Sequence, residues 1–247
     1  MYKRLIAELG DDVAHIDCTF PAPKPGEDAA ASLRAALDRI FAEAEQAVRD
    51  ERSHVVLSDE SQSADRVACP MILVTGGVHA HLTKQGLRTY CSLSVRAGEC
   101  LDPHYAAVLI GCGATTINPY LAFDTIADRA ARGLSGGLSY AKAAANYRAA
   151  LDAGLLKIMS KMGISVLSSY RGGLNFEAIG LSRALADEFF PGLTSRISGI
   201  GLAGLAIEAA EQNARAFDGA AAALPVGGLY RVRASGERHA LEAASIH

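Results

Sequence analysis

Two histidines separated by one residue, His79 and His81, are the clearest candidates for metal chemistry in this sequence. On a β-strand, residues two apart point to the same side, so both imidazoles could reach one metal ion. A stand-alone metal-dependent hydrolase would complete such a site with a later carboxylate such as Asp102. The pair follows a helix-like run, however, and residues two apart on a helix do not face together. We therefore prefer two histidines near a helix end and predict no metal ligand.

Other candidate groups point to nucleophilic, phosphate or RNA chemistry. Cys112 stands between two glycines near a helix start, which would favour a reactive thiolate, although a small buried cysteine is the competing interpretation. The Gly-Cys-Gly segment is too short for a phosphate-binding fingerprint, and a single Arg171-Gly-Gly is weak evidence for RNA binding. Sequence order assembles no Ser/His/Asp or Cys/His triad. We predict neither a catalytic nor a cofactor-binding residue.

Composition limits the class of protein. Half of the 247 residues are hydrophobic and the mean hydropathy is +0.15, which indicates a folded globular chain. A net charge of −3 argues against nucleic acid and anionic membranes as partners. The five cysteines form no C-x-x-C pair, as is typical of reduced thiols in a cytosol. We expect a cytoplasmic protein without a signal peptide or a membrane span.

Apolar periodicity predicts helices that alternate with short strands. Helices are expected over 29–50, from 70, from 103, and over 120–131, 140–153, 155–162, 183–190 and 203–217. Strands are expected over 54–57, 88–96 and 164–167. Asp102 and Asn118 each precede a proline and are expected to cap a helix start. We predict an α/β fold, either barrel-like or layered, and expect it to be incomplete because the strands are too few for an eight-fold barrel.

The stretch 155–173 is the most informative single segment. Lys157 and Lys161 lie one turn apart on the predicted helix, and Gly163 stands where a helix end favours a left-handed residue. The predicted strand that follows runs into Tyr170, Arg171 and two glycines. Loops at the carboxyl ends of strands are where ligands or partner domains usually dock in α/β proteins, with core packing and a tight turn as the alternative.

Five ordered segments resemble the central domain of the glutamate synthase large subunit, over about residues 12 to 215. They read LSDE at 57–60, GGVHAHLTKQGLRT at 76–89, AVLIGCGATTINPYLAFDTI at 107–126, GLLKIMSKMGIS at 154–165 and SYRGGLNFEAIGLS at 169–182. The chain departs from the family pattern at Glu60, where many relatives have arginine, and His104 is what remains of a histidine pair. Agreement in order and rough spacing makes this signal stronger than any single motif.

The resemblance implies a role in ammonia assimilation. In that family a glutaminase domain releases ammonia, which condenses with 2-oxoglutarate at an FMN domain fed with electrons by an iron–sulfur cluster. The central domain joins the two sites, so we expect this chain to be a connector that is inactive alone and carries neither cofactor. Its expected partners are the glutaminase and FMN domains, on the same or a separate chain, and self-association is also expected. The electron donor stays open.

The resemblance also divides the chain. Residues 1–28 are interpreted as a Pro-rich connector, 29–217 as the C-terminal part of the central domain, and 218–247 as a truncated lead-in to the FMN domain. The candidates for contact with the neighbouring domains are Lys157, Lys161, Tyr170 and Arg171. None of these is a catalytic residue in the family pattern.

Overall fold

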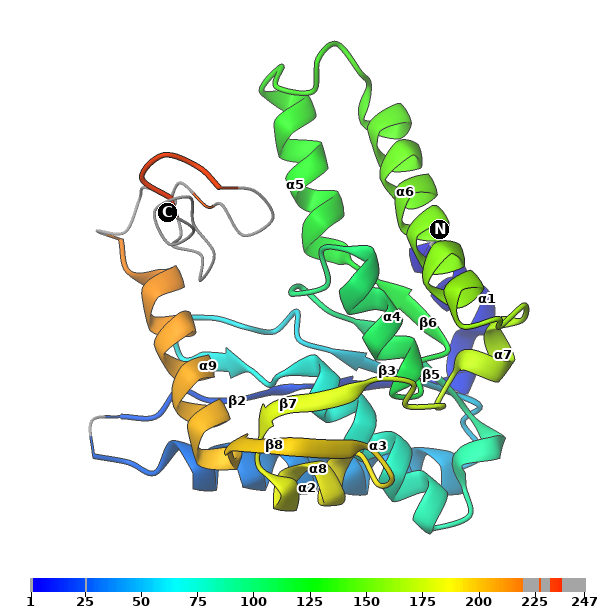
Figure 1. Cartoon of the computed structure of the whole chain (residues 1–247), viewed down its shortest axis with the longest axis vertical. Coiled ribbons are helices and arrows are strands. Elements are labelled where there is room, and N and C mark those ends of the chain that lie inside the picture. The colour runs from blue at the N-terminus through cyan, green and yellow to red at the C-terminus, as the bar shows by residue number, and fades with distance from the viewer. Residues whose placement is uncertain (1, 25, 220–226, 228–231, 237–247) are drawn as a thin grey trace, which may run out of the picture.

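A four-stranded parallel sheet lies at the centre of the fold, with its strands in the order β1–β3–β5–β6 (Figure 1). The computed structural model describes residues 2–24, 26–219, 227 and 232–236. The strands are β1 Val13–Asp17, β3 His54–Ser58, β5 Ser92–Arg96 and β6 Thr116–Asn118. In register, Ala14 pairs with Val55 and Val55 with Leu93. Residues 55–57 are fully buried, a continuous apolar run of the kind that parallel strands show when both faces are covered.

Helices connect and cover these strands. The first four long helices are α2 Ala29–Arg49, α3 Met71–Lys84, α4 Pro103–Gly111 and α5 Tyr120–Ala131. They follow β2 Thr19–Pro21, β4 Arg66–Ala68, β5 and β6 in turn. The predicted cap of α4 is confirmed, since the Asp102 carboxylate accepts the Tyr105 N–H at 2.8 Å. The predicted cap at Asn118 is wrong, because that residue ends β6 and α5 starts after Pro119 without a side-chain cap.

Two smaller sheets flank the centre. β2 Thr19–Pro21 pairs antiparallel with β4 Arg66–Ala68, and β7 Glu177–Leu181 pairs parallel with β8 Thr194–Ile200. The remaining helices are α1 Tyr2–Leu9, α6 Tyr140–Lys161, α7 Leu167–Tyr170, α8 Arg183–Phe189 and α9 Leu202–Phe217, with 3₁₀ turns at Gly10–Asp12 and Arg88–Tyr90. The α/β prediction is confirmed, and the described part is layered rather than barrel-like because the four-stranded sheet stays open. Within that part, no helix is both long and apolar enough to cross a membrane.

The interpretation of residues 1–28 as an unpacked connector is wrong for β1 and β2. Ile16, Cys18 and Phe20 are at most 3 % exposed, and β1 is an edge strand of the central sheet. These three residues alternate at the period of a half-buried strand, a signal that the prolines immediately after them obscured. The domain boundaries at 28 and 217 stay predictions, and residues 220–226, 228–231 and 237–247 of the predicted lead-in lie outside the described residues.

The predicted strand over 164–167 is also wrong. Gly163 ends α6 with φ +70°, as predicted, and the chain then enters the one-turn helix α7. Val166 and Leu167 are 52 % and 43 % exposed, so this short apolar run is not buried. A run of this length does not distinguish a strand from a helix by pattern alone.

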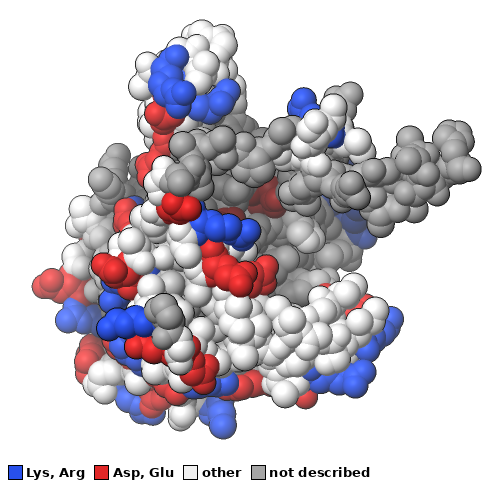
Figure 2. Space-filling view, turned by 90° about the vertical axis from the view of Figure 1, so that its left-hand side faces the viewer, with Lys and Arg blue, Asp and Glu red and all other residues white. Residues whose placement is uncertain are grey.

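Helices α5 and α6 form a hairpin that projects from the body (Figure 1). α6 packs on α4 and on α5, and Gly154 allows this approach because a Cβ there would lie 2.4 Å from the Pro103 ring. The ring edge of Phe123 meets Tyr147, whose hydroxyl donates to the Leu101 carbonyl at 3.0 Å. Figure 2 shows the hairpin standing clear of the body, with Lys and Arg near its end.

Aromatic rings rest on bare helix backbone at several glycines. A Cβ on Gly76 would lie 2.3 Å from the Phe190 ring, and a Cβ on Gly77 would lie 2.5 Å from the Phe41 ring. The Phe176 ring covers Gly111 in the same way, at 2.3 Å. Segment 172–193 is thereby seated on α3 and α4. This packing explains a Gly-Gly pair inside a helix, where each glycine costs about 1 kcal/mol relative to alanine.

We expect Gly76→Ala to lower the free energy of unfolding, despite its better helix propensity, by about 1–3 kcal/mol, because the new methyl group overlaps a buried ring. The measurement is urea unfolding followed by circular dichroism. In a Phe190→Ala background the same substitution should cost less, since the ring is gone and only the Phe189 carbonyl oxygen, 2.9 Å from the new Cβ, still opposes it. Equal costs in the two backgrounds would contradict the ring-on-glycine account.

Candidate functional site

The carboxyl edge of the central sheet is the first place where an α/β protein is expected to hold a site. Asp59 follows β3, Glu99 lies just beyond β5, and Tyr120 follows β6. Asp59 is 2 % exposed, and both of its carboxylate oxygens accept the Gly98 N–H, at 3.0 and 3.1 Å. The sequence placed Asp59 at a strand end, but no sequence signal marked its burial.

These acidic groups hold the fold together. Glu99 accepts the Met71 N–H at 2.6 Å, which satisfies a free amide at the start of α3. Tyr120 bonds to Asp59 and accepts from Gln62 Nε2 at 3.1 Å, so the three strand ends are joined. Burial raises the pKa of Asp59 to about 6, although bonds from Gly98 and Tyr120 oppose the shift. At this edge, where α/β enzymes commonly place catalytic residues, Asp59 and Tyr120 join strand ends and Glu99 caps a helix.

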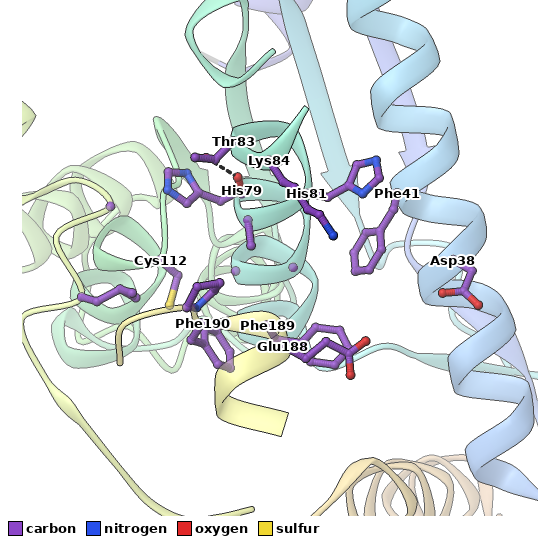
Figure 3. A pocket seen from close by; sticks show the side chains of 16 residues that line it. Asp38, Phe41, His79, His81, Thr83, Lys84, Cys112, Glu188, Phe189 and Phe190 are labelled. Carbon is purple, nitrogen blue, oxygen red and sulfur yellow. Dashed lines mark hydrogen bonds between the residues drawn. The ribbon is translucent and has the colours of Figure 1, made fainter. Parts of the chain in front are cut away.

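A groove of about 560 Å³ lies on the outer side of α3 between α2 and α8 (Figure 3). Its floor is the Gly76–Gly77 backbone with the rings of Phe41, Phe189 and Phe190. Its polar lining includes both histidines of the H-x-H pair and the side chains of Asp38, Lys84 and Glu188.

The two histidines point to opposite sides of α3 (Figure 3). His79 Nδ1 accepts from Arg88 Nε at 3.0 Å, and burial, with the Arg88 and Arg171 cations, lowers the His79 pKa to about 4. His81 Nε2 pairs with Glu45 at 2.7 Å while its ring stacks on Phe41 at 5.6 Å. Each imidazole thus has its own partners on a different side of the helix.

The metal-dependent hydrolase hypothesis is wrong. His79 and His81 lie on a helix rather than a strand, and Asp102 is the N-cap of α4. No group of three His, Cys, Asp or Glu side chains that could hold a metal ion occurs among the described residues. Cys112 is 1 % exposed, and burial raises its pKa to about 12, so it is a packed thiol rather than a thiolate.

The stretch 155–173 presents a partly apolar surface. Leu156, Met162, Val166 and Leu167 are between 43 % and 66 % exposed. Lys157, Lys161 and Arg171 are exposed on the same segment. We call these seven residues the docking face. Tyr170 does not belong to it, because it is 2 % exposed and packs with Ala107, Ile110 and Met159.

Comparison with known proteins decides the family. Residues 3–182 match the model of the glutamate synthase central domain. The chain belongs to the glutamate synthase central domain family. It is 57 % identical to the glutamate synthase [NADPH] large chain of Azospirillum brasilense over 239 residues, which cover 97 % of this chain. It is 38 % identical to the Bacillus subtilis [NADPH] large chain and to the chloroplastic ferredoxin-dependent glutamate synthase of Spinacia oleracea, over 87 % and 84 % of this chain.

This glutamate synthase central domain is a small part of its relatives. The matched region spans 16 % of the A. brasilense protein and 14 % of each of the other two. The relatives include NADPH-named and ferredoxin-named enzymes, so similarity to them does not choose an electron donor for this chain. Glu60 is paired with Arg96 at the end of β5.

We expect Asp59→Asn to flatten part of the pH dependence of stability. The folded pKa of Asp59, about 6, lies above the ordinary 3.8, so the native state binds the proton more tightly than the unfolded chain. The contribution of Asp59 to the free energy of unfolding is fully present below about pH 4. It falls by about 3 kcal/mol as the pH rises through 6.

The measurement is urea unfolding at pH 4.5, 5.5 and 7 for the wild type and the variant. Asp59→Asn should gain relative to the wild type as pH rises, whereas Asp152→Asn, on the exposed side of α6, should follow the wild-type profile. Parallel profiles for wild type and Asp59→Asn would show that the carboxyl does not titrate in this range.

Proposed function

We propose that this chain is the connecting part of a glutamate synthase large chain, and that it holds a glutaminase site and a flavin site in register. The whole enzyme would convert glutamine, 2-oxoglutarate and reductant into two molecules of L-glutamate. In this proposal the chain supplies packing surfaces, and the chemistry takes place on the polypeptide outside it. The observation that carries the proposal is the docking face, an apolar and cationic surface within a segment that resembles the family signature.

The described residues do not fit the two cofactors that the family resemblance implies. An iron–sulfur cluster needs several thiolates gathered around one point. The five cysteines are buried, and no group of three His, Cys, Asp or Glu side chains that could hold a metal occurs in residues 2–24, 26–219, 227 and 232–236. The groove on α3 is lined by Asp38 and Glu188 as well as Lys84, and Glu188 is already paired with Arg34, so the groove offers a flavin phosphate no net positive charge. We therefore place FMN and the cluster on other parts of the enzyme.

The seating of segment 172–193 supports a rigid connector. The Gly172 and Leu174 amides donate to the carbonyls of Ile110 and Gly111, at 3.0 and 3.2 Å. The Arg34 guanidinium on α2 donates two hydrogen bonds to the Glu188 carboxylate on α8, at 2.5 and 3.0 Å. The chain therefore leaves the central sheet in one fixed direction, through β7, α8 and β8, before it reaches α9.

We infer that the domain extends from β1 through α9, with residues beyond 217 leading toward the flavin domain. Lys157, Lys161 and Arg171 are the proposed contact cations, and the four apolar side chains of the docking face are the proposed contact centre. Buried Tyr170 supports this face from below instead of touching a partner.

We expect substitutions in the docking face to weaken binding to the neighbouring domains. Leu156→Ser with Val166→Ser should lower the affinity for a flavin-bearing or glutaminase-bearing polypeptide by about tenfold or more, because apolar contacts at an interface centre carry most of the energy. Lys157→Gln with Lys161→Gln should lower it a few-fold and reduce its salt dependence. The measurement is titration of the purified 247-residue chain with two separately expressed segments of the A. brasilense large chain, one that would bear the glutaminase and one that would bear the flavin.

Ile207→Ser is the matched control, since Ile207 is 53 % exposed but lies on α9, outside the docking face. It should leave both affinities unchanged. A result in which the control weakens binding as much as the docking-face variants, or in which neither polypeptide binds, would contradict the proposed function.

A further inference from the structure

The free end of the α5–α6 hairpin has a charge opposite to that of the chain as a whole. Residues 129–148 contain Arg129, Arg132, Lys142 and Arg148 and no acidic residue, although the net charge of the chain is −3. Arg132 pairs with Asp128, just before this stretch, at 3.3 Å, so the excess positive charge comes from the other three. Figure 2 shows these charge types in space, with Lys and Arg near the end of the hairpin and Asp and Glu farther down. We call residues 129–142 the hairpin tip.

The hairpin tip also exposes large apolar side chains. Leu134, Leu138 and Tyr140 are 48 %, 43 % and 47 % exposed. The lower part of the hairpin is fixed through Phe123, Tyr147 and Gly154, as described above, so these tip residues are not needed to hold α5 and α6 together. Exposed apolar side chains that share a short segment with cations are typical of a protein-binding surface.

The tip is ordered by its own backbone. Gly133, Gly136 and Gly137 have φ of +70°, +61° and +81°, conformations that other residues rarely adopt. The Leu134 amide donates to the Arg129 carbonyl at 2.8 Å, the hydrogen bond that closes the end of α5. The Ser139 hydroxyl accepts the Lys142 N–H at 3.4 Å and caps α6. A tip held in one shape loses little conformational entropy on binding.

We propose that the hairpin tip docks into an apolar depression rimmed by Asp and Glu on the part of the large chain that lies outside these 247 residues. Charge complementarity selects the acidic rim, and the three exposed apolar side chains select a protein over a nucleic acid. The relatives provide the room for such a surface, because the matched region is 16 % of the A. brasilense protein. This inference rests on the proposed connector function and extends it.

Helix α6 then joins two contact surfaces. Its 22 residues span about 33 Å. The hairpin tip lies at its start and the docking face at its end, so one rigid helix fixes the distance between two partner surfaces. α4 and α5 both pack on α6, which suits this use, since bending would change the separation of the two sites.

The test embeds the chain in a full-length enzyme. Residues of this chain replace the 239-residue matching region of the A. brasilense large chain, and amide hydrogen exchange of the tip is followed by mass spectrometry in that protein and in the isolated chain. Amides of residues 133–140 should exchange about tenfold or more slowly in the full-length protein. Leu134→Ser with Leu138→Ser should abolish the slowing. Lys142→Gln with Arg148→Gln, at two exposed cations, should reduce it and make it less sensitive to salt.

Leu121→Ser is the matched control, because Leu121 is 43 % exposed near the base of α5 and should leave the slowing intact. Unchanged exchange of α3 amides verifies that each variant folds. The proposal is overturned if the tip exchanges equally fast in both proteins. It is also overturned if slowing appears in the isolated chain as its concentration rises, or on adding single-stranded DNA or phosphatidylserine vesicles.

The two proposals can fail separately. Loss of affinity in the docking-face variants with no slowing at the tip would refute the tip inference and retain the connector function. Slowing at the tip with docking-face variants that bind normally would support the tip inference and refute the proposed role of the docking face.

Discussion

Close packing of aromatic rings on glycine backbone is the constraint on which the rest of this structure depends. Gly76, Gly77 and Gly111 lie where any side chain would collide with Phe190, Phe41 or Phe176. These contacts seat the segment after α7 against α3 and α4, and they thereby set the direction in which the chain continues. A fold built in this way tolerates little change of volume at its helix surfaces, because close-packed interiors transmit even small displacements. Such rigidity suits a part whose use is to position others.

At the carboxyl edge of the sheet, too, the notable side chains stabilise the fold. Asp59 and Glu99 stand where an α/β enzyme would place ligands, yet one bridges strand ends and the other caps α3. The two histidines that most resemble metal ligands brace α3 against the Arg88 turn and against α2. The polar side chains that a reader would first assign to chemistry thus hold packed elements together. Exposed apolar side chains lie elsewhere, at both ends of α6 and also on β7, β8 and α9.

Periodicity predicted the long elements well and the short ones poorly. The apolar spacing over 29–50 and the Asp102-Pro103 cap produced α2 and the start of α4 as expected. Strand β1 was missed because prolines after it suggested a connector, and the run at 164–167 was predicted as a strand although it continues as a helical turn. The glycines at 76 and 77 were noted only as weakening a helix, because the rings that require them are distant in sequence. Of the four residues predicted to contact other domains, Lys157, Lys161 and Arg171 are exposed. The burial of Tyr170 depends on tertiary packing that no local pattern contains.

In the proposed function this chain positions the catalytic domains of a glutamate synthase large chain, and the chemistry takes place on those other domains. The most direct test is to purify the 247-residue chain and to record its visible absorption and its formation of glutamate from glutamine and 2-oxoglutarate with NADPH or reduced ferredoxin. The account predicts no flavin spectrum and no glutamate above the rate without protein. Flavin bound at one per chain together with glutamate formation would contradict it.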